Sequence, residues 1–255
     1  MQGLIDIFKP ERTFRPQRKF TRDSKRGLLF EKAQATLGLQ LCMSDMVVVP
    51  PGEDKYEWIA VHAVDFFNRI SLIFGTLTET CLSSTCPAMS HSNGSKRWDW
   101  KWQDNVRYKK PTRLPAPEYI FQLMNWVEHE LNDDELFPLS SAEPWPRDFM
   151  RRIQRIFTRL HRVFVHVYYS HFRRIQEIAG EAQVIFFLVN YCYKHFWFFV
   201  NAHALIPQSE LEPLADLASR ICRKRKDYPD NIPPGLIPST PPKPHKSSLF
   251  GYKKS

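Results

Sequence analysis

Apolar residues recur at three- and four-residue spacing through most of this chain, and strand-like alternation of apolar and polar residues is scarce. That period is typical of helices with one apolar face. Helix-start signals mark three positions, with Pro117, Asp148 and Pro207 each at or just before an expected first turn. We therefore expect an all-α fold with helices over residues 28–38, 54–78, 117–131, 147–177, 190–203 and 208–222.

One segment, residues 97–111, departs from the helical pattern. Trp98, Trp100 and Trp102 alternate there with polar residues, and an Asp-Asn pair follows as a turn signal. This alternation predicts a short two-stranded β-hairpin within 97–111. Its tryptophans are expected to pack against the domain rather than to stack on nucleobases. The Asn-Gly-Ser sequence just before the segment predicts a further turn.

Composition divides the chain into three parts. Residues 1–27 form a basic segment that we expect to be extended, and residues 28–222 form the globular domain. Residues 223–255, with seven prolines between positions 229 and 244, have the composition of a disordered basic tail. The formal charge of +9 is concentrated at the ends, because these three parts carry net charges of +5, −2 and +6 in that order. A slightly acidic domain argues against a nucleic-acid groove, although binding of nucleic acid or phosphate through the basic tails stays open as an alternative.

The apolar content does not predict a membrane protein. The strongest apolar run, residues 184–200, is interrupted by Asn190, Lys194 and His195. It therefore lacks the 18 or more consecutive apolar residues that a membrane-spanning helix needs. The amino terminus shows no pattern of a secretory signal. We therefore expect a cytoplasmic protein, with the nucleus as a second location, whose five cysteines form no disulfide framework.

Two cysteines and two histidines make a candidate metal site. Cys81 and Cys86 stand in a loop-like segment with four residues between them, and His166 and His171 follow after 79 intervening residues. Two thiolates and two imidazoles suit tetrahedral zinc, but the spacing is loose and leaves ordinary core or surface residues as an equal alternative. On a straight helix the two histidines would point roughly 140° apart, so a helix break or a π-type turn is required between them.

Signals of catalysis are absent from the sequence. His129 and Glu130 begin an H-E-x-x-H motif, but Asp133 stands where its second histidine is required. The chain also has no zinc-deaminase pattern, no glycine-rich phosphate loop and no nucleophile elbow. A zinc bound by four protein ligands leaves no position for a water molecule, so we expect a structural metal and no enzyme activity.

Two charged clusters remain. Glu53, Asp54 and Glu57 lie at the start of an expected helix, where helix capping explains them as well as a binding role does. A row of arginines occupies one stripe of the longest expected helix, at positions 151, 155, 159 and 162. The row can clamp a phosphate or lie on a solvated face, and its lack of interleaved carboxylates favours a bound anion or an acidic neighbour.

Several motifs, in order along residues 12–222, resemble those of the Mob kinase-activator (Mob/phocein) family, and FRPQRKF and AVHAVDFFNRI resemble its class 3 branch. The matching motifs are GEDKYEWIAVHAVDFFNRISLIFGT (52–76), CLSSTCPAMS (81–90), YKKP (108–111), APEYIFQLMNWV (116–127) and HVYYSHF (166–172). The resemblance implies a four-helix bundle with additional helices, a short β-hairpin and a structural zinc ion. It also implies a non-enzymatic adaptor that regulates protein kinases of the Hippo (MST) and NDR/LATS type.

The family's site residues are carried over position by position. The zinc ligands fall on Cys81, Cys86, His166 and His171. The acidic kinase-docking surface falls on Glu53, Asp54, Glu57 and Trp58. Of three basic residues in the phosphopeptide pocket, Arg159 and Arg162 are present and the third is replaced by Thr158, which makes MST-type kinases the better expected partners.

Further departures from the family pattern concern packing. About five extra residues, Ile185 to Val189, are apolar and are expected to be buried or to form a sticky surface. His161 stands where the family usually has an aromatic residue.

Overall fold

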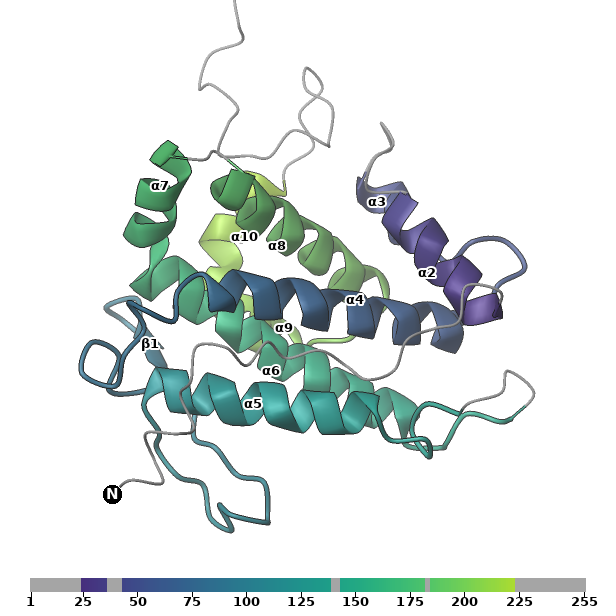
Figure 1. The fold of residues 1–255 in the computed structure, drawn as a ribbon, viewed down its shortest axis with the longest axis horizontal. Helices are drawn as coiled ribbons and strands as arrows, with labels where there is room; N and C mark the ends of the chain where they lie inside the picture. The colour runs from purple at the N-terminus through teal and green to yellow at the C-terminus, as the bar shows by residue number, and fades with distance from the viewer. Residues whose placement is uncertain (1–23, 36–42, 139–142, 182–183, 223–255) are drawn as a thin grey trace, which may run out of the picture.

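The computed structural model describes residues 24–35, 43–138, 143–181 and 184–222, and these are mostly helical (Figure 1). The helices are α2 (Lys25–Ala35), α3 (Met43–Met46), α4 (Lys55–Gly75), α5 (Ala116–Leu131), α6 (Phe149–Ser170), α7 (Phe172–Glu181), α8 (Val184–Ala202), α9 (Gln208–Leu211), the 3-10 helix η2 (Glu212–Leu214) and α10 (Ala215–Ile221). Two short strands, β1 (Ser90–Ser92) and β2 (Arg97–Asp99), complete the described elements.

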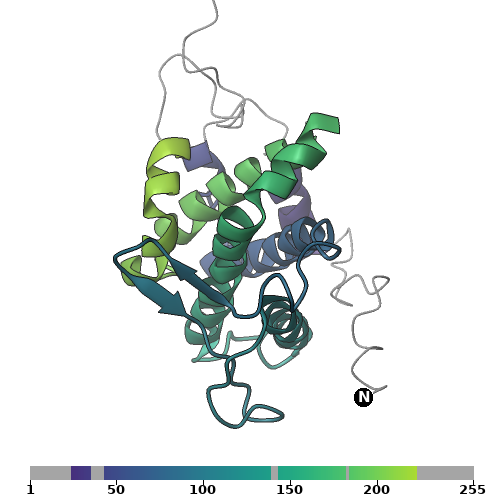
Figure 2. The same ribbon diagram turned by 90° about the vertical axis from the view of Figure 1, so that its left-hand side faces the viewer.

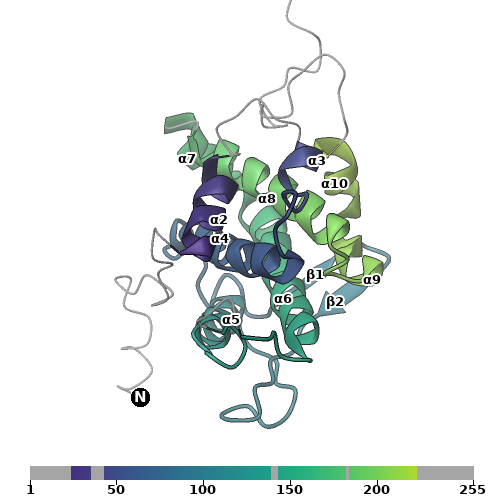
Figure 3. The same cartoon turned by 90° about the vertical axis from the view of Figure 1, so that its right-hand side faces the viewer.

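Helix α4 is the centre of the packing. It contacts α2, α5, α6 and α8, and α5 also contacts α6 (Figure 1). The residues from Glu57 to Phe67 are all buried, as expected for a helix that is apolar on nearly every side. Helix α2 packs on α4 and helix α3 packs on α8, and both face the viewer in Figure 3. The described part of the chain is therefore mostly helical, as predicted, with one small two-stranded hairpin.

The long helix predicted over 147–177 is wrong as a single element. Helix α6 ends at Ser170 and α7 begins at Phe172, and His171 between them has φ −129° and ψ 9°. The break that the two histidines required is thus present. The last predicted helix, 208–222, is also divided, because Pro213 cannot donate a backbone hydrogen bond and α9 passes into the 3-10 helix η2 before α10.

The hairpin predicted within 97–111 has a different pairing. Strand β2 pairs with the preceding β1 in antiparallel register, Ser90 opposite Asp99, and the two strands lie at one side of the helices (Figure 2). The turn between them is the predicted Asn-Gly-Ser turn, in which Gly94 has φ +93° and the Asn93 side chain accepts a hydrogen bond from the backbone of Lys96. Within 100–138, the described stretch after β2, strand-like pairing is limited to an isolated bridge between Trp102 and Thr112.

The tryptophans of this region pack inward. Trp100 and Trp102 are buried in the core, and Trp98 is half-buried against it. The expectation that they serve packing is confirmed.

Element boundaries shift at both ends of the domain. Helix α2 begins at Lys25, so the last residues of the expected extended segment 1–27 are helical; residues 1–23 lie outside the described part. Helix α8 begins at Val184 and so takes the inserted residues Ile185 to Val189 into its first turns, where Val189 is buried. The expected disorder of 223–255 concerns residues outside the described ones. Among the described helices, none is both long and apolar enough to cross a membrane.

Candidate functional site

The four predicted metal ligands come together although they belong to distant parts of the chain. Cys81 and Cys86 lie in the loop after α4, and His166 and His171 lie at the end of α6 and in the α6–α7 break. All four are buried, and their ligand atoms lie within 4.8 Å of one another. The Sγ atom of Cys81 is 3.3 Å from Nε2 of His166, the Sγ atom of Cys86 is 3.4 Å from Nε2 of His171, and the two Nε2 atoms are 3.1 Å apart.

These distances fit a tetrahedral metal site. Zinc bonds of the usual length to sulfur and nitrogen give S···N edges of about 3.5 Å and N···N edges of about 3.3 Å in a tetrahedron. Nδ1 of His166 lies 3.3 Å from the hydroxyl oxygen of Ser170, and donation of its proton there leaves the lone pair of Nε2 toward the other ligands. The four residues can therefore hold a metal ion, and every one of their ligand atoms is used in doing so.

The electrostatics of the cluster also suit a cation. Burial, and then the neighbouring His171, lower the pKa of His166 to about 3, so its imidazole is neutral at pH 7. Burial, and then the thiol of Cys86, raise the pKa of Cys81 far above its usual range. A buried thiol such as that of Cys81 loses its proton readily only to a bound cation.

The residues carried over as a kinase-docking surface have unequal exposure. Asp54 is exposed and caps α4, because its carboxylate accepts hydrogen bonds from the backbone of Tyr56 at 2.9 Å and of Glu57 at 3.0 Å. Glu53 beside it is half-buried. The expected capping role of this cluster is thus present, and Glu53 and Asp54 are the members that face solvent.

The other two members of that surface face inward. Glu57 is buried and its carboxylate is bound by the guanidinium of Arg26 in α2. Trp58 is 1% exposed and its Nε1 donates a hydrogen bond to the backbone of Val47 at 3.2 Å. Their role in kinase docking stays a prediction, since neither side chain is exposed in this structure.

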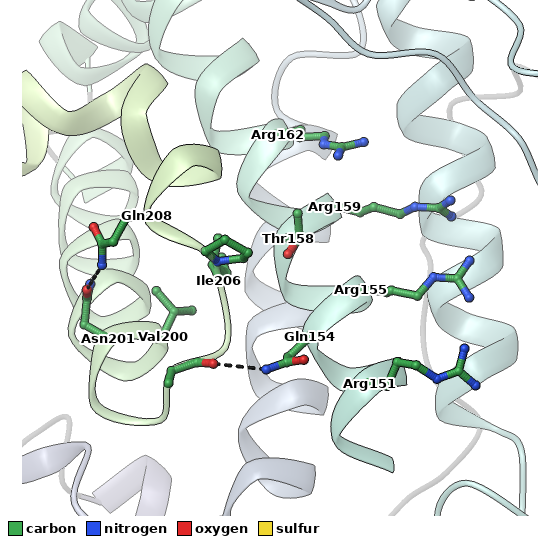
Figure 4. Close-up of a pocket in the computed structure, with 12 residues that line it drawn as sticks. Arg151, Gln154, Arg155, Thr158, Arg159, Arg162, Val200, Asn201, Ile206 and Gln208 are labelled. Atoms are coloured by element: carbon green, nitrogen blue, oxygen red, sulfur yellow. Dashed lines mark hydrogen bonds between the residues drawn. The ribbon is translucent and has the colours of Figure 1, made fainter. Parts of the chain in front are cut away.

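The arginine row lines a pocket. A pocket of about 710 Å3 opens between α6 and the segment that joins α8 to α9. Its lining residues are Arg151, Gln154, Arg155, Thr158, Arg159 and Arg162 from α6, with Val200, Asn201, Ala204, Ile206, Pro207 and Gln208 across from them. Figure 4 shows the four arginine side chains extending from α6 in the same direction, with Thr158 among them. The two carried-over residues, Arg159 and Arg162, thus share one concave surface.

Two of these arginines already have acidic neighbours. Arg151 forms an ion pair with Asp148, and Arg162 forms one with Glu210 of α9 at 3.3 Å. Arg162 also donates a hydrogen bond to the hydroxyl oxygen of Tyr119 at 2.9 Å. The expectation of an acidic neighbour is therefore met inside the chain. Sequence reasoning missed Glu210 because it lies 48 residues from Arg162 and has no local pattern that marks it.

Arg159 is held between two indole rings. Its guanidinium carbon lies 4.6 Å from the ring centre of Trp102 and 4.4 Å from that of Trp126 in α5. Its Nη2 donates to the backbone oxygen of Gln103 at 3.3 Å, while its buried Nη1 has no partner among the described residues. Burial lowers the pKa of Arg159 to about 10, so it still carries its charge at pH 7. Arg159 therefore holds a fixed positive charge in the wall of the pocket.

Comparisons with known proteins agree with these features. The model of the Mob1/phocein family matches residues 34–214. The chain is 46% identical to human MOB kinase activator 3B over 220 residues, which cover 86% of this chain and 98% of that protein. It is 45% identical to human MOB kinase activators 3A and 3C over 219 residues, which cover 86% of this chain and 97% and 98% of those proteins.

Proposed function

Because the chain belongs to the Mob1/phocein family and resembles its class 3 members over most of its length, we propose that it is an adaptor that regulates protein kinases. The relatives carry the name of kinase activators, which supports a regulator rather than an enzyme. The adaptor binds kinases of the Hippo (MST) and NDR/LATS type, acts in the cytoplasm and nucleus, and has MST-type kinases as its main partners.

The observation that carries this proposal is the pocket along α6. It presents Arg159 and Arg162 on one wall, and the buried Nη1 of Arg159 is left without a partner among the described residues. A guanidinium group binds phosphate through two parallel hydrogen bonds, which makes such a pocket suitable for a phosphorylated kinase segment.

A second contact with the kinase lies at the start of α4. Glu53 and Asp54 offer carboxylates to a basic helical segment, and Glu57 and Trp58 join them when the contacts that bury them, with Arg26 of α2 and with Val47, are opened. Release of α2 costs the buried contact between Arg26 and Glu57, so we expect this surface to bind more weakly than the pocket.

Zinc is the metal that fits the ligand set of Cys81, Cys86, His166 and His171. When bound, it joins the loop after α4 to the end of α6. Since the four side chains complete a tetrahedral shell, no position remains for a substrate or a water molecule, and the proposed role of the metal is structural.

Binding to kinase fragments tests the proposed function. The intact chain is mixed with MST-type and NDR-type kinase fragments, each phosphorylated and unphosphorylated, and the complexes are separated by size-exclusion chromatography. We expect a complex with the phosphorylated MST-type fragment that Arg159→Gln weakens. If neither kinase type binds in either state, the proposal is wrong. Binding that survives Arg159→Gln but is lost when 1–27 and 223–255 are removed would support the basic ends as the binding elements instead.

A further inference from the structure

The arginines of α6 differ in whether a carboxylate neutralises them. Three have acidic partners: Arg151 pairs with Asp148, Arg152 with Glu130 and Asp133, and Arg162 with Glu210. The remaining two, Arg155 and Arg159, have no carboxylate partner among the described residues. The uncompensated positive charge of the pocket is therefore concentrated at these two positions, one helical turn apart.

Arg155 and Arg159 lie against the same indole ring. The guanidinium carbon of Arg155 is 5.5 Å from the ring centre of Trp126, and that of Arg159 is 4.4 Å from it. Figure 4 shows the two side chains extending side by side from α6, on the side away from Val200, Asn201 and Gln208, and both residues line the pocket. Contact with one ring restricts both side chains and keeps two like charges close together, which costs free energy unless an anion compensates it.

We propose that Arg155 is a further anion-binding residue of this pocket and forms, with Arg159, the pair that holds a phosphate group. In this pair Arg155 supplies the cation that the family pattern would place at Thr158. Trp126 is a positioning residue, which acts through both arginines without touching the ligand. The inference rests on the proposed function, because it names the residues by which the same pocket recognises a phosphorylated peptide.

The chemistry of the pair matches a phosphomonoester. At pH 7 such a group carries between one and two negative charges and three acceptor oxygens. Two neighbouring guanidinium groups can each donate a forked pair of hydrogen bonds to the phosphate. A carboxylate has only two oxygens and can accept such a pair from only one guanidinium group. Thr158 lies between these arginines in the sequence and is half-buried, and its short side chain lines the same pocket. Arg162 is bound to Glu210 and Tyr119, so it contributes to the shape of the pocket more than to its positive charge.

Two charge-matched variants of the full chain test the role of Arg155. Arg155→Gln and Arg151→Gln each remove one positive charge from the same stripe of α6, one turn apart. The probe is a synthetic peptide with one phosphothreonine, compared with the same peptide unphosphorylated, and affinity is measured by calorimetry. We expect Arg155→Gln to weaken phosphopeptide binding by about tenfold, the loss of one charge-assisted contact, and Arg151→Gln to weaken it less than about twofold.

A third variant tests the positioning role of Trp126. Trp126→Leu leaves every charge in place, so a purely electrostatic site would keep its affinity. We expect a loss of about threefold or more in phosphopeptide affinity and recovery of most of it in Trp126→Phe, since phenylalanine restores an aromatic face. Unchanged thermal unfolding of both variants would separate this effect from a change in the fold.

The outcomes separate the two levels of the account. Equal losses in Arg155→Gln and Arg151→Gln, from a wild-type chain that binds the phosphopeptide, would overturn the assignment of Arg155 and leave the proposed function standing. A wild-type chain that does not distinguish the phosphorylated from the unphosphorylated peptide would overturn this inference, and the binding of kinase fragments described above would then decide the proposed function separately.

Discussion

The carboxylate of Glu57 in α4 is bound by the guanidinium of Arg26 in α2, and both side chains are almost fully buried, at 4% and 8% exposure. The same guanidinium donates to the backbone oxygen of Pro138 and lies 4.9 Å from the ring centre of Trp145. One side chain therefore joins α2, the start of α4 and the segment before α6. The pair also occupies a carboxylate that the family pattern assigns to kinase docking.

Loss of Arg26 is expected to destabilise the domain. Arg26→Gln leaves the buried carboxylate of Glu57 without its counter-charge, which costs about 3 kcal/mol in the free energy of unfolding. Urea denaturation measures the change. The control is Lys96→Gln, because Lys96 and Glu212 form an exposed ion pair whose loss costs below about 1 kcal/mol. Equal effects of the two substitutions would mean that the Arg26–Glu57 pair does not hold α2 on α4.

Removal of the metal ligands is expected to remove both the metal and the fold of the region that they join. Cys81→Ser and His171→Ala should each reduce zinc content to below half a zinc ion per chain and lower the melting temperature, because binding of a structural metal contributes directly to folding. Metal analysis and thermal unfolding measure the two effects. Cys222→Ser, at a buried cysteine outside the cluster, should keep its zinc. Zinc retained by both ligand variants would disprove the ligand assignment.

Buried neutral histidines should make the domain sensitive to acid. Burial lowers the pKa of His62 and of His161 to about 3, below the value of 6.5 for an exposed histidine. Between these values the unfolded chain binds protons that the folded chain does not, so stability is full above pH 6.5 and falls as the pH drops toward 3. The expected slope is about 1.4 kcal/mol per pH unit for each histidine.

The variant His161→Phe isolates one of these protons. It restores the aromatic residue expected from the family and removes a titrating group, so the dependence of unfolding free energy on pH between 6.5 and 4 should become shallower. Denaturation at a series of pH values measures the slope. An unchanged slope would mean that His161 is protonated in the folded domain.

Glu210 is expected to weaken anion binding in the pocket. Its carboxylate oxygen lies 3.3 Å from Nη2 of Arg162, which lines the pocket. Glu210→Gln removes a negative charge near the bound phosphate and should raise affinity for a phosphothreonine peptide by about threefold or more at low salt. Glu212→Gln, an acidic residue of the adjacent turn that pairs with Lys96, is the control. A fall in affinity on Glu210→Gln would show that the ion pair shapes the site instead.

Local sequence patterns predicted the helical class and most helix positions, and they made the four metal ligands candidates. The spacing of apolar residues within 54–78 predicts helix α4, and Asp54 marks its first turn. The residue types of the two Cys-His pairs suit tetrahedral coordination, but their spacing left an equal alternative open. The resemblance to the Mob family supplied the assignment, and the structure brings the four together across a separation of 85 positions. Coordination by both histidines also predicted the break at His171.

Features that depend on distant partners could not be read in the same way. Strand β2 pairs backward with β1 because the turn at Asn93 and Gly94 is tighter than the segment after Trp102, and alternation alone does not choose between the two. The contacts of Arg26 with Glu57 and of Arg162 with Glu210 join residues with no shared local pattern. The charge balance of the arginine row therefore became clear only from the structure.

Kinase regulation itself is tested most directly by the rate of phosphate transfer. The measurement is the activity of an MST-type kinase toward a protein substrate, with and without a saturating amount of the intact chain. We expect the chain alone to transfer no phosphate. Added to the kinase, it should change the rate of phosphate transfer by at least about twofold, whereas an inert protein should leave that rate unchanged. The Arg155→Gln, Arg159→Gln double variant should lose this effect. An unchanged rate for both MST-type and NDR-type kinases would contradict the account.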